Sequence, residues 1–234
     1  RADRLHGVGL GLYGLRSIPL VGREAERDQM WSALGRVRAQ GRARVVVLRG
    51  SAGTGKSRLA KWLCERAHEI GAAHVLRAFH SEDGGPLDGM GPMVGRYFRC
   101  SGLSHSEARE QIRSTLGQSA DLVDGELEAI AELVSSNSTQ VGEDEGTVLF
   151  DRPETWYAVL ERLLVRLSDD RPAVLWLDDV QWGLDALGFS QHLLDHQSTN
   201  PSPVLVVMTV RDEALQRCAR PPARAQSVLL LRAR

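Results

Sequence analysis

The chain has 234 residues, of which 42% are hydrophobic and 25% are charged, a composition typical of a globular protein with one full hydrophobic core. Its 29 basic and 30 acidic side chains give a net charge of -1, so no overall charge attracts nucleic acid or an anionic membrane. No apolar run reaches the ~18 residues of a membrane span, and the cysteines lack metal-binding or redox spacing. We therefore expect a soluble cytoplasmic protein with reduced cysteines.

The first part of the chain is predicted to hold a linker, a helix, a strand and a second helix. Residues 1–17 are glycine-spaced and lack the features of a signal peptide, which indicates a linker ahead of one domain over residues 18–234. Helical spacing of apolar side chains predicts a helix over residues 23–38. The β-branched sequence RVVVLR predicts a strand over residues 44–49, buried on both faces, and helical spacing resumes over residues 56–70.

Strands alternate with helices in the rest of the chain. Strands are predicted over residues 74–79, 173–177, 203–210 and 227–231, and helices over residues 153–167 and 184–194. Residues 93–136 show short helical patterns, which we interpret as an inserted helical block, and residues 138–146 form a polar, acidic loop. The alternation predicts an α/β fold with a mainly parallel sheet and right-handed crossovers.

A phosphate-binding pattern lies between the strand at residues 44–49 and the helix at residues 56–70. GxxxxGK[ST] is matched at every fixed position by Gly50, Ser51, Ala52, Gly53, Thr54, Gly55, Lys56 and Ser57. Glycines let backbone N–H groups converge on phosphate oxygens, and the helix N-terminus adds a partial positive charge of ~0.5. Lys56 is expected to reach the β and γ phosphates, and the Ser57 hydroxyl to coordinate Mg²⁺. An incidental glycine turn is the alternative, but the flanking elements favour the phosphate site.

Two carboxylates follow the strand at residues 173–177. Mg²⁺ bridging the β and γ phosphates needs a carboxylate in its coordination sphere, and Asp178 is our candidate for that role. Asp179 is placed to accept a proton from an attacking water or to orient it. The alternative is that these side chains only cap the next helix.

Four segments together resemble the AAA-type ATPase module of the STAND P-loop NTPases, or origin-recognition-like AAA domains, which occur fused to bacterial kinases, cyclases and transcription regulators. The segments are LVGRE at residues 20–24, GSAGTGKSRLA at 50–60, LWLDDVQW at 175–182 and TVRDEAL at 209–215. The resemblance spans residues 19–231 and rests on the order of all four segments. It implies a three-layer P-loop NTPase sandwich whose five parallel strands, numbered along the chain, lie in the order 5-1-4-3-2.

The resemblance also implies a site for ATP or ADP with Mg²⁺. The LVGRE segment, with Val21, Gly22 and Arg23, would border the adenine and ribose, and Arg58 closes the nucleotide-binding segment of the P-loop. Arg211 would act as a catalytic sensor at the γ phosphate, and a cation at a strand end beside the Asp178 strand stabilises phosphate charge.

Two simpler interpretations remain open at the arginine positions. Arg211 is also compatible with an ordinary solvent-exposed side chain, because a strand end is a normal surface position. Arg23 is also compatible with a salt bridge to Glu24 or Glu26 at the start of the helix.

Departures from the family pattern shape the functional hypotheses. No helical lid, effector or sensor domain follows Arg234, so we expect a fragment of a longer polypeptide. Asp179 stands where efficient AAA hydrolases commonly carry Glu, and its shorter reach favours slow turnover. No [NT]KxD signature favours guanine over adenine.

Three functions compete on this pattern. The first is a slow Mg-dependent ATPase used as a switch, whose nucleotide state controls self-association or the other domains of the same polypeptide. The second is a structural ADP- or ATP-binding module with negligible hydrolysis. The third is a small-molecule kinase, since the P-loop serves that chemistry as well.

Overall fold

The computed structural model describes residues 20–84, 88–116, 124–135, 152–215 and 228–232. The predicted linker at residues 1–17 and the acidic loop at residues 138–146 lie outside these ranges. Helices and strands follow in the order α2 (Glu24–Gln40), β1 (Arg44–Gly50), α3 (Lys56–Glu69), β2 (His74–Phe79), α4 (Met90–Phe98), α5 (His105–Leu116), α6 (Asp124–Ser135), α7 (Pro153–Leu167), β3 (Ala173–Asp178), η1 (Val180–Trp182), α8 (Leu184–His196), β4 (Val204–Arg211), α9 (Asp212–Leu215) and β5 (Val228–Arg232). No helix within the described ranges is long and apolar enough to cross a lipid bilayer.

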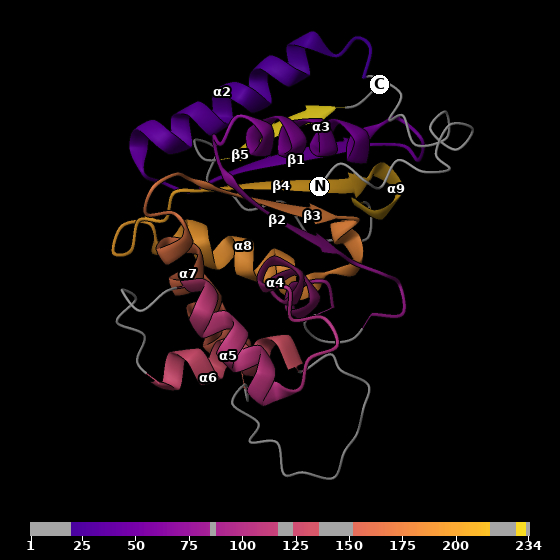
Figure 1. The fold of residues 1–234 in the computed structure, drawn as a ribbon. Coiled ribbons are helices and arrows are strands. Elements are labelled where there is room, and N and C mark those ends of the chain that lie inside the picture. The colour runs from indigo at the N-terminus through magenta and orange to yellow at the C-terminus, as the bar shows by residue number, and fades with distance from the viewer. Residues whose placement is uncertain (1–19, 85–87, 117–123, 136–151, 216–227, 233–234) are drawn as a thin grey trace, which may run out of the picture.

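One parallel sheet organises the fold (Figure 1). Its five strands lie in the order β2-β3-β4-β1-β5. This is the predicted order 5-1-4-3-2 written from the other edge, so the predicted topology is confirmed. Strand β3 extends through Asp178 and pairs that residue with Phe79 of β2, which makes the candidate metal-binding carboxylate the last residue of the sheet strand.

Successive residues of a strand belong to two separate hydrophobic cores, one on each face of the sheet. In β1, Val45 and Val47 join the core that contains α7 and α8, whereas Val46 and Leu48 join the core that contains α2 and α3. Figure 1 shows α2 and α3 on one side of the sheet and α7 and α8 on the other. This alternation explains why the strands are apolar at consecutive positions: both faces of a parallel sheet are covered by helices.

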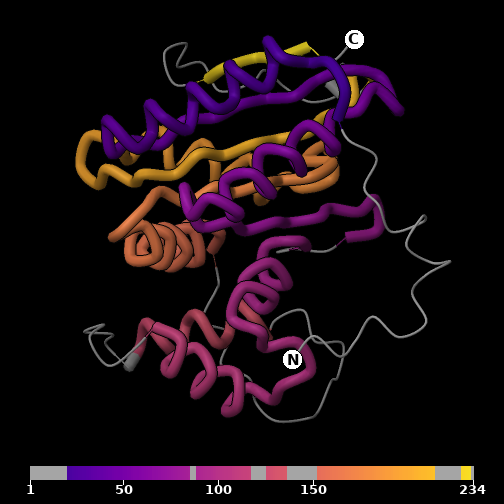
Figure 2. Tube along the Cα trace, turned by 45° about the horizontal axis from the view of Figure 1, so that its top comes forward, coloured from indigo at the N-terminus to yellow at the C-terminus, as the bar shows by residue number. Residues whose placement is uncertain are grey.

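Helices α4, α5 and α6 form a block at the β2 edge of the sheet. Helix α4 contacts β2, α5 and α6 pack on each other, and α6 contacts α7. Figure 2 shows α5 and α6 well away from the strands. Their buried side chains Ile112, Leu127 and Ile130 belong to the same core as α7 and α8. The block begins at Met90, ahead of the expected residue 93, because Pro92 is tolerated in the first turn of a helix.

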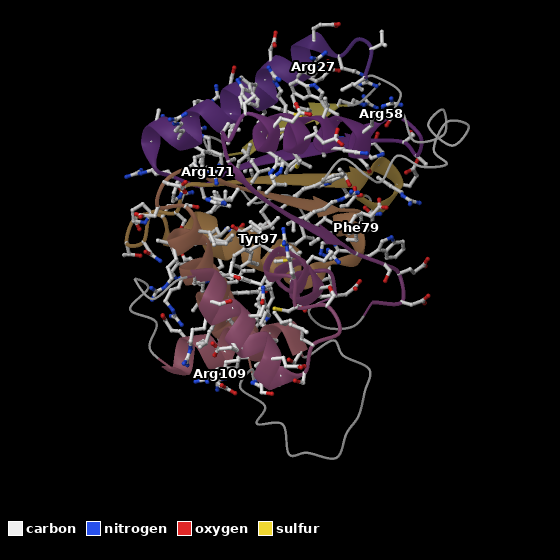
Figure 3. The ribbon with its side chains drawn as sticks, viewed as in Figure 1. Arg27, Arg58, Phe79, Tyr97, Arg109 and Arg171 are labelled. Atoms are coloured by element: carbon white, nitrogen blue, oxygen red, sulfur yellow. The ribbon has the colours of Figure 1, made fainter. Side chains whose placement is uncertain are left out.

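The carboxyl ends of the parallel strands meet at one edge of the sheet. Phe79 ends β2 at this edge, while Arg171 precedes β3 at the opposite edge, and Figure 3 shows the two side chains far apart along the strand direction. In open parallel sheets, ligands bind outside the carboxyl ends of the strands. The residues that follow β1, β3 and β4 therefore define the place to look for a site.

Candidate nucleotide site

The loop between β1 and α3 has the backbone of an anion site. Gly53 and Gly55 have φ values of 79° and 84°, a left-handed conformation that glycine adopts without strain. A Cβ built on either glycine would meet no atom of the described residues within 4 Å, so the space beside the loop is open to a ligand. Helix α3 has no side-chain cap among the described residues and no acid in its first turn. Its first N–H groups and its partial positive charge therefore face that open space.

Lys56 is held against this loop rather than in solvent. Its side chain is only 7% exposed, and its Nζ donates to the carbonyl oxygens of Gly50 at 2.9 Å and Ser51 at 2.8 Å. Burial lowers the pKa of Lys56 below its ordinary value, and the carboxylate of Asp179 opposes that effect. An ammonium so placed is poised to exchange two carbonyl contacts for phosphate oxygens.

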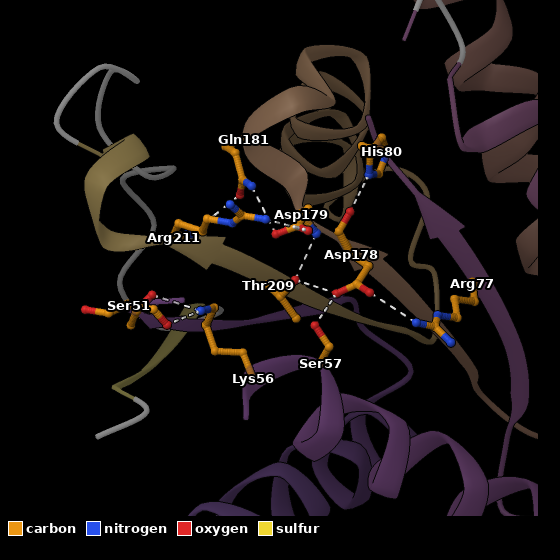
Figure 4. Close-up of polar contacts among 11 residues, drawn as sticks. Ser51, Lys56, Ser57, Arg77, His80, Asp178, Asp179, Gln181, Thr209 and Arg211 are labelled. Atoms are coloured by element: carbon orange, nitrogen blue, oxygen red, sulfur yellow. Dashed lines mark hydrogen bonds and ion pairs between the residues drawn. The ribbon is translucent and has the colours of Figure 1, made fainter. Parts of the chain in front are cut away.

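Asp178 is the centre of the polar network (Figure 4). Its Oδ1 accepts hydrogen bonds from Ser57 Oγ at 2.8 Å and Thr209 Oγ1 at 2.7 Å, and its Oδ2 accepts one from Arg77 Nη2 at 3.1 Å. The structure thus brings together the two residues predicted to serve the metal, Ser57 from α3 and Asp178 from β3. All three contacts converge on the two oxygens of a residue that is 8% exposed.

Arg77 is a site residue that the sequence analysis missed. It lies on β2 opposite Trp176 of β3, and its guanidinium carbon is 3.5 Å from the Trp176 ring centroid and 3.7 Å from that of Phe79. The available signal was a charged residue inside the apolar strand sequence HVLRAF. Such a residue needs a partner, and here the partner is Asp178.

Asp179 lies outside the strand in a strained turn. Its backbone has φ 52° and ψ 47°, the left-handed region that Asp and Asn tolerate better than most residues. Its N–H donates to Thr209 Oγ1 at 2.9 Å, while its Oδ1 accepts from Gln181 Nε2 at 3.0 Å and its Oδ2 from Arg211 Nη2 at 3.5 Å. Its side chain makes no capping hydrogen bond to η1. The capping alternative therefore fails for Asp179, and the structure instead pairs this carboxylate with Arg211.

His80 and Gln181 support the turn from two sides, and no sequence motif assigns either of them to the site. His80 is buried, and its Nδ1 donates to the backbone oxygen of Asp178 at 2.9 Å, which fixes the carbonyl between the two carboxylates. A side chain at Gly183 would collide with the His80 ring, with a Cβ only 2.3 Å from Cδ2. Gln181 Oε1 accepts from the Arg211 N–H at 3.4 Å, so it links the ends of β3 and β4.

The LVGRE segment approaches the loop through Arg23. Its Nη2 donates to the carbonyl oxygen of Thr54 at 2.9 Å, and its Nη1 pairs with Glu26 Oε1 at 3.2 Å. The salt bridge and the approach to the P-loop therefore coexist. Val21 is 84% exposed and Gly22 has a φ of 76°, while Arg58 is exposed on α3.

Strand β1, the glycine loop and helix α3 follow one another along the chain, and β4 separates β1 from β3, the strand that ends in the carboxylate. This arrangement defines a P-loop nucleoside-triphosphate-binding domain. A family model described as an AAA ATPase domain matches residues 19–207, and the chain belongs to this family. A comparison with curated protein sequences finds no significant match.

The solved structures that match this chain are distant from it in sequence. The chain is 11% identical to a chain in the structure of Drosophila ORC bound to AT-rich DNA and Cdc6, covering 90% of this chain and 28% of that one with a TM-score of 0.45. It is 14% identical to a chain of the E. coli MS115-1 HORMA:CdnC:Trip13 complex, covering 91% and 63% with a TM-score of 0.38. For C. elegans PCH-2 the identity is 14%, the coverage 89% and 41%, and the TM-score 0.35. The chain thus spans less than two thirds of each of these relatives.

Proposed function

We propose that this chain is the ATP-binding domain of a larger signalling or regulatory protein of the STAND type, and that it hydrolyses ATP slowly as a nucleotide-controlled switch. The observation that carries the proposal is the 2.8 Å contact between Ser57 Oγ and Asp178 Oδ1, next to an open glycine loop. A hydroxyl at a helix start and a buried carboxylate at a strand end are the donor set that Mg²⁺ takes up beside nucleotide phosphates.

Each part of the loop has a distinct task toward the nucleotide. The N–H groups at the start of α3 would bind phosphate oxygens, and Lys56 would supply the charge that balances them. Magnesium, when bound, supplies electrostatic stabilisation of the β and γ phosphates. Ser57 and Asp178 would hold it, and Thr209 keeps Asp178 oriented by donating to the same Oδ1 that Ser57 contacts.

Base and ribose recognition is assigned to the segment before α2. Val21 offers an exposed apolar side chain, and Arg23 joins this segment to the P-loop through the carbonyl of Thr54. An exposed valine provides apolar surface on which an adenine ring would pack, and such a contact would explain why the side chain is not buried in the fold.

The way Asp179 is held supports the proposal of slow hydrolysis. A carboxylate that activates water must have an oxygen available to accept its proton. Each Asp179 oxygen already accepts one hydrogen bond, from Gln181 or from Arg211, so these donors compete with a water molecule for the lone pairs of the carboxylate. Arg211 would leave Asp179 for the γ phosphate, which links the arrival of ATP to the release of the catalytic carboxylate.

The same contacts favour a second function, a structural ADP or ATP module. If Gln181 and Arg211 hold Asp179 permanently, the domain retains nucleotide and releases almost no phosphate. Nucleotide would then serve only to stabilise the fold, by mass action on the folded state.

Calorimetric titration with ATP and ADP, in Mg²⁺ and in EDTA, tests nucleotide binding, and phosphate release at saturating Mg-ATP separates the two functions. Asp178→Asn should reduce the gain in affinity that Mg²⁺ provides. Asp170→Asn is the matched control, because Asp170 is an exposed carboxylate before β3 at the opposite edge of the sheet. Unchanged magnesium dependence in Asp178→Asn would contradict the metal assignment. Gel filtration of the full-length protein with ADP and with a non-hydrolysable ATP analogue tests the switch.

A further inference from the structure

Arg77 places a fixed positive charge against the carboxylate that is assigned to Mg²⁺. Its Nη2 is 3.1 Å from Asp178 Oδ2, and its side chain is 33% exposed. An arginine side chain carries a fixed positive charge, which persists whatever the nucleotide state. The magnesium site therefore contains a protein cation in addition to Lys56.

We propose that Arg77 sets the magnesium affinity of the site by weakening it, so that the Mg-nucleotide complex can leave. This inference rests on the proposed function, because it assigns Mg²⁺ to Ser57 and Asp178. Two cations that share one carboxylate repel each other, and the carboxylate stabilises each of them less than it would stabilise one alone. Arg77 is thus an affinity-setting residue and not a catalytic one.

The orientation of Asp178 does not depend on Arg77. Ser57 and Thr209 both donate to Oδ1, and Thr209 is completely buried. The backbone oxygen of Asp178 is fixed by His80. Removing Arg77 should therefore change the charge near the metal much more than the geometry of the carboxylate.

Arg77 is also prevented from moving away when a metal arrives. The Trp176 and Phe79 rings lie at 3.5 and 3.7 Å from its guanidinium carbon, and stacking on ring faces holds a guanidinium in place. Arg96 of α4 donates to the backbone oxygen of Arg77 at 2.7 Å, which ties this part of β2 to the helical block. The positive charge of Arg77 therefore stays beside Asp178 when a metal binds.

The measured quantity is the magnesium coupling, the ratio of the ADP dissociation constant in EDTA to that in saturating Mg²⁺. This ratio separates the effect of Arg77 on the metal from its attraction for the phosphates, which acts in both conditions. Loss of one partly screened charge beside a divalent ion should raise the ratio by roughly 3- to 30-fold in Arg77→Met. Methionine retains the apolar stem between the two rings.

Arg77→Lys and Arg171→Met complete the design. Lysine keeps the charge, so its coupling ratio should stay within about 3-fold of wild type. Arg171 precedes β3 at the opposite edge of the sheet, and its removal should leave the ratio unchanged. Thermal unfolding provides a second readout. Without nucleotide, Arg77→Met should unfold at a lower temperature than wild type, because Asp178 loses its charged partner. On addition of Mg-ADP, the unfolding temperature of Arg77→Met should rise by more than that of wild type.

An unchanged or lower ratio in folded Arg77→Met would overturn the inference, and so would a ratio in Arg77→Lys as high as in Arg77→Met. If Arg77→Met fails to fold, Arg77→Gln replaces it with the same expectation. Absence of ADP binding by wild type in both conditions would refute the proposed function and this inference with it. Wild-type binding with an unchanged ratio in the variants would refute the role of Arg77 alone.

Discussion

Replacement of Lys56 by Met separates nucleotide binding from the stability of the domain. Lys56 is 7% exposed and its ammonium donates to two carbonyl oxygens of the glycine loop, so we expect it to be the main protein counter-charge for bound phosphates. Truncating a buried charge-assisted contact costs about 2 to 4 kcal/mol of binding free energy. The expected increase in the nucleotide dissociation constant is therefore roughly 30- to 1000-fold.

The ligand-free domain should respond differently to this substitution. Burial lowers the pKa of Lys56, so folding disfavours its charged form relative to solvent, while two carbonyl contacts offset that cost. We expect the free energy of unfolding to change by less than about 1 kcal/mol in Lys56→Met. In the pH range just below the ordinary lysine pKa the unfolded chain binds more protons, so this group makes wild-type stability rise with pH there. The Met variant should lack that rise.

Calorimetry with Mg-ADP and urea unfolding without ligand measure the two effects on the same protein. Lys61→Met is the matched control, since Lys61 lies on the same helix and forms an exposed i,i+4 pair with Glu65. Its nucleotide affinity should equal that of wild type. Equal affinity in Lys56→Met and wild type would refute the assignment of the P-loop, whatever the unfolding data show.

Three further substitutions or modifications test other parts of the structure. Thr209→Val removes a buried hydroxyl that donates to Asp178 and accepts from the Asp179 N–H, so urea unfolding should show a loss of about 1 to 3 kcal/mol, and wild-type stability would contradict this network. Asp179→Asn should keep ATP bound in the full-length protein but lower phosphate release by roughly 10²-fold or more, and equal release would remove this residue from the catalytic group. Burial raises the pKa of Cys64 to about 12, so in a Cys218→Ser variant a thiol reagent at pH 8 should leave Cys64 unmodified until urea opens the domain, as followed by mass spectrometry.

The strands of the sheet could be predicted because each one is indicated by its own run of residues. Runs such as RVVVLR and AVLWL are apolar at consecutive positions, which indicates burial on both faces, and each run is followed by a helix or a turn. The strand order came from the resemblance to a family and not from the runs themselves. The predicted ends of helices and strands are less accurate, because pairing with a neighbouring strand decides which residue is the last of a strand. Asp178 belongs to β3 because it pairs with Phe79 of β2.

The glycine loop and the candidate metal-binding carboxylate could be named from the sequence because each is a contiguous motif. Arg77 could not be assigned to the site in the same way, because 101 positions separate it from Asp178 and only the crossover between β2 and β3 brings them together. Gln181 and His80 were missed for a related reason. His80 contacts a backbone oxygen, and Gln181 contacts a backbone N–H and the Asp179 carboxylate within one turn, none of which a pattern of residue types records.

The left-handed backbone at position 179 decides which carboxylate can stand there. A side chain at φ 52° and ψ 47° costs on the order of 1 kcal/mol for most residues, and Asp is among the few whose short polar group compensates locally. Glutamate would reach farther toward a water molecule but would have to accept this backbone or change the turn that Thr209, Gln181 and Arg211 hold. A longer carboxylate at position 179 would therefore combine a gain in reach with a cost in backbone conformation.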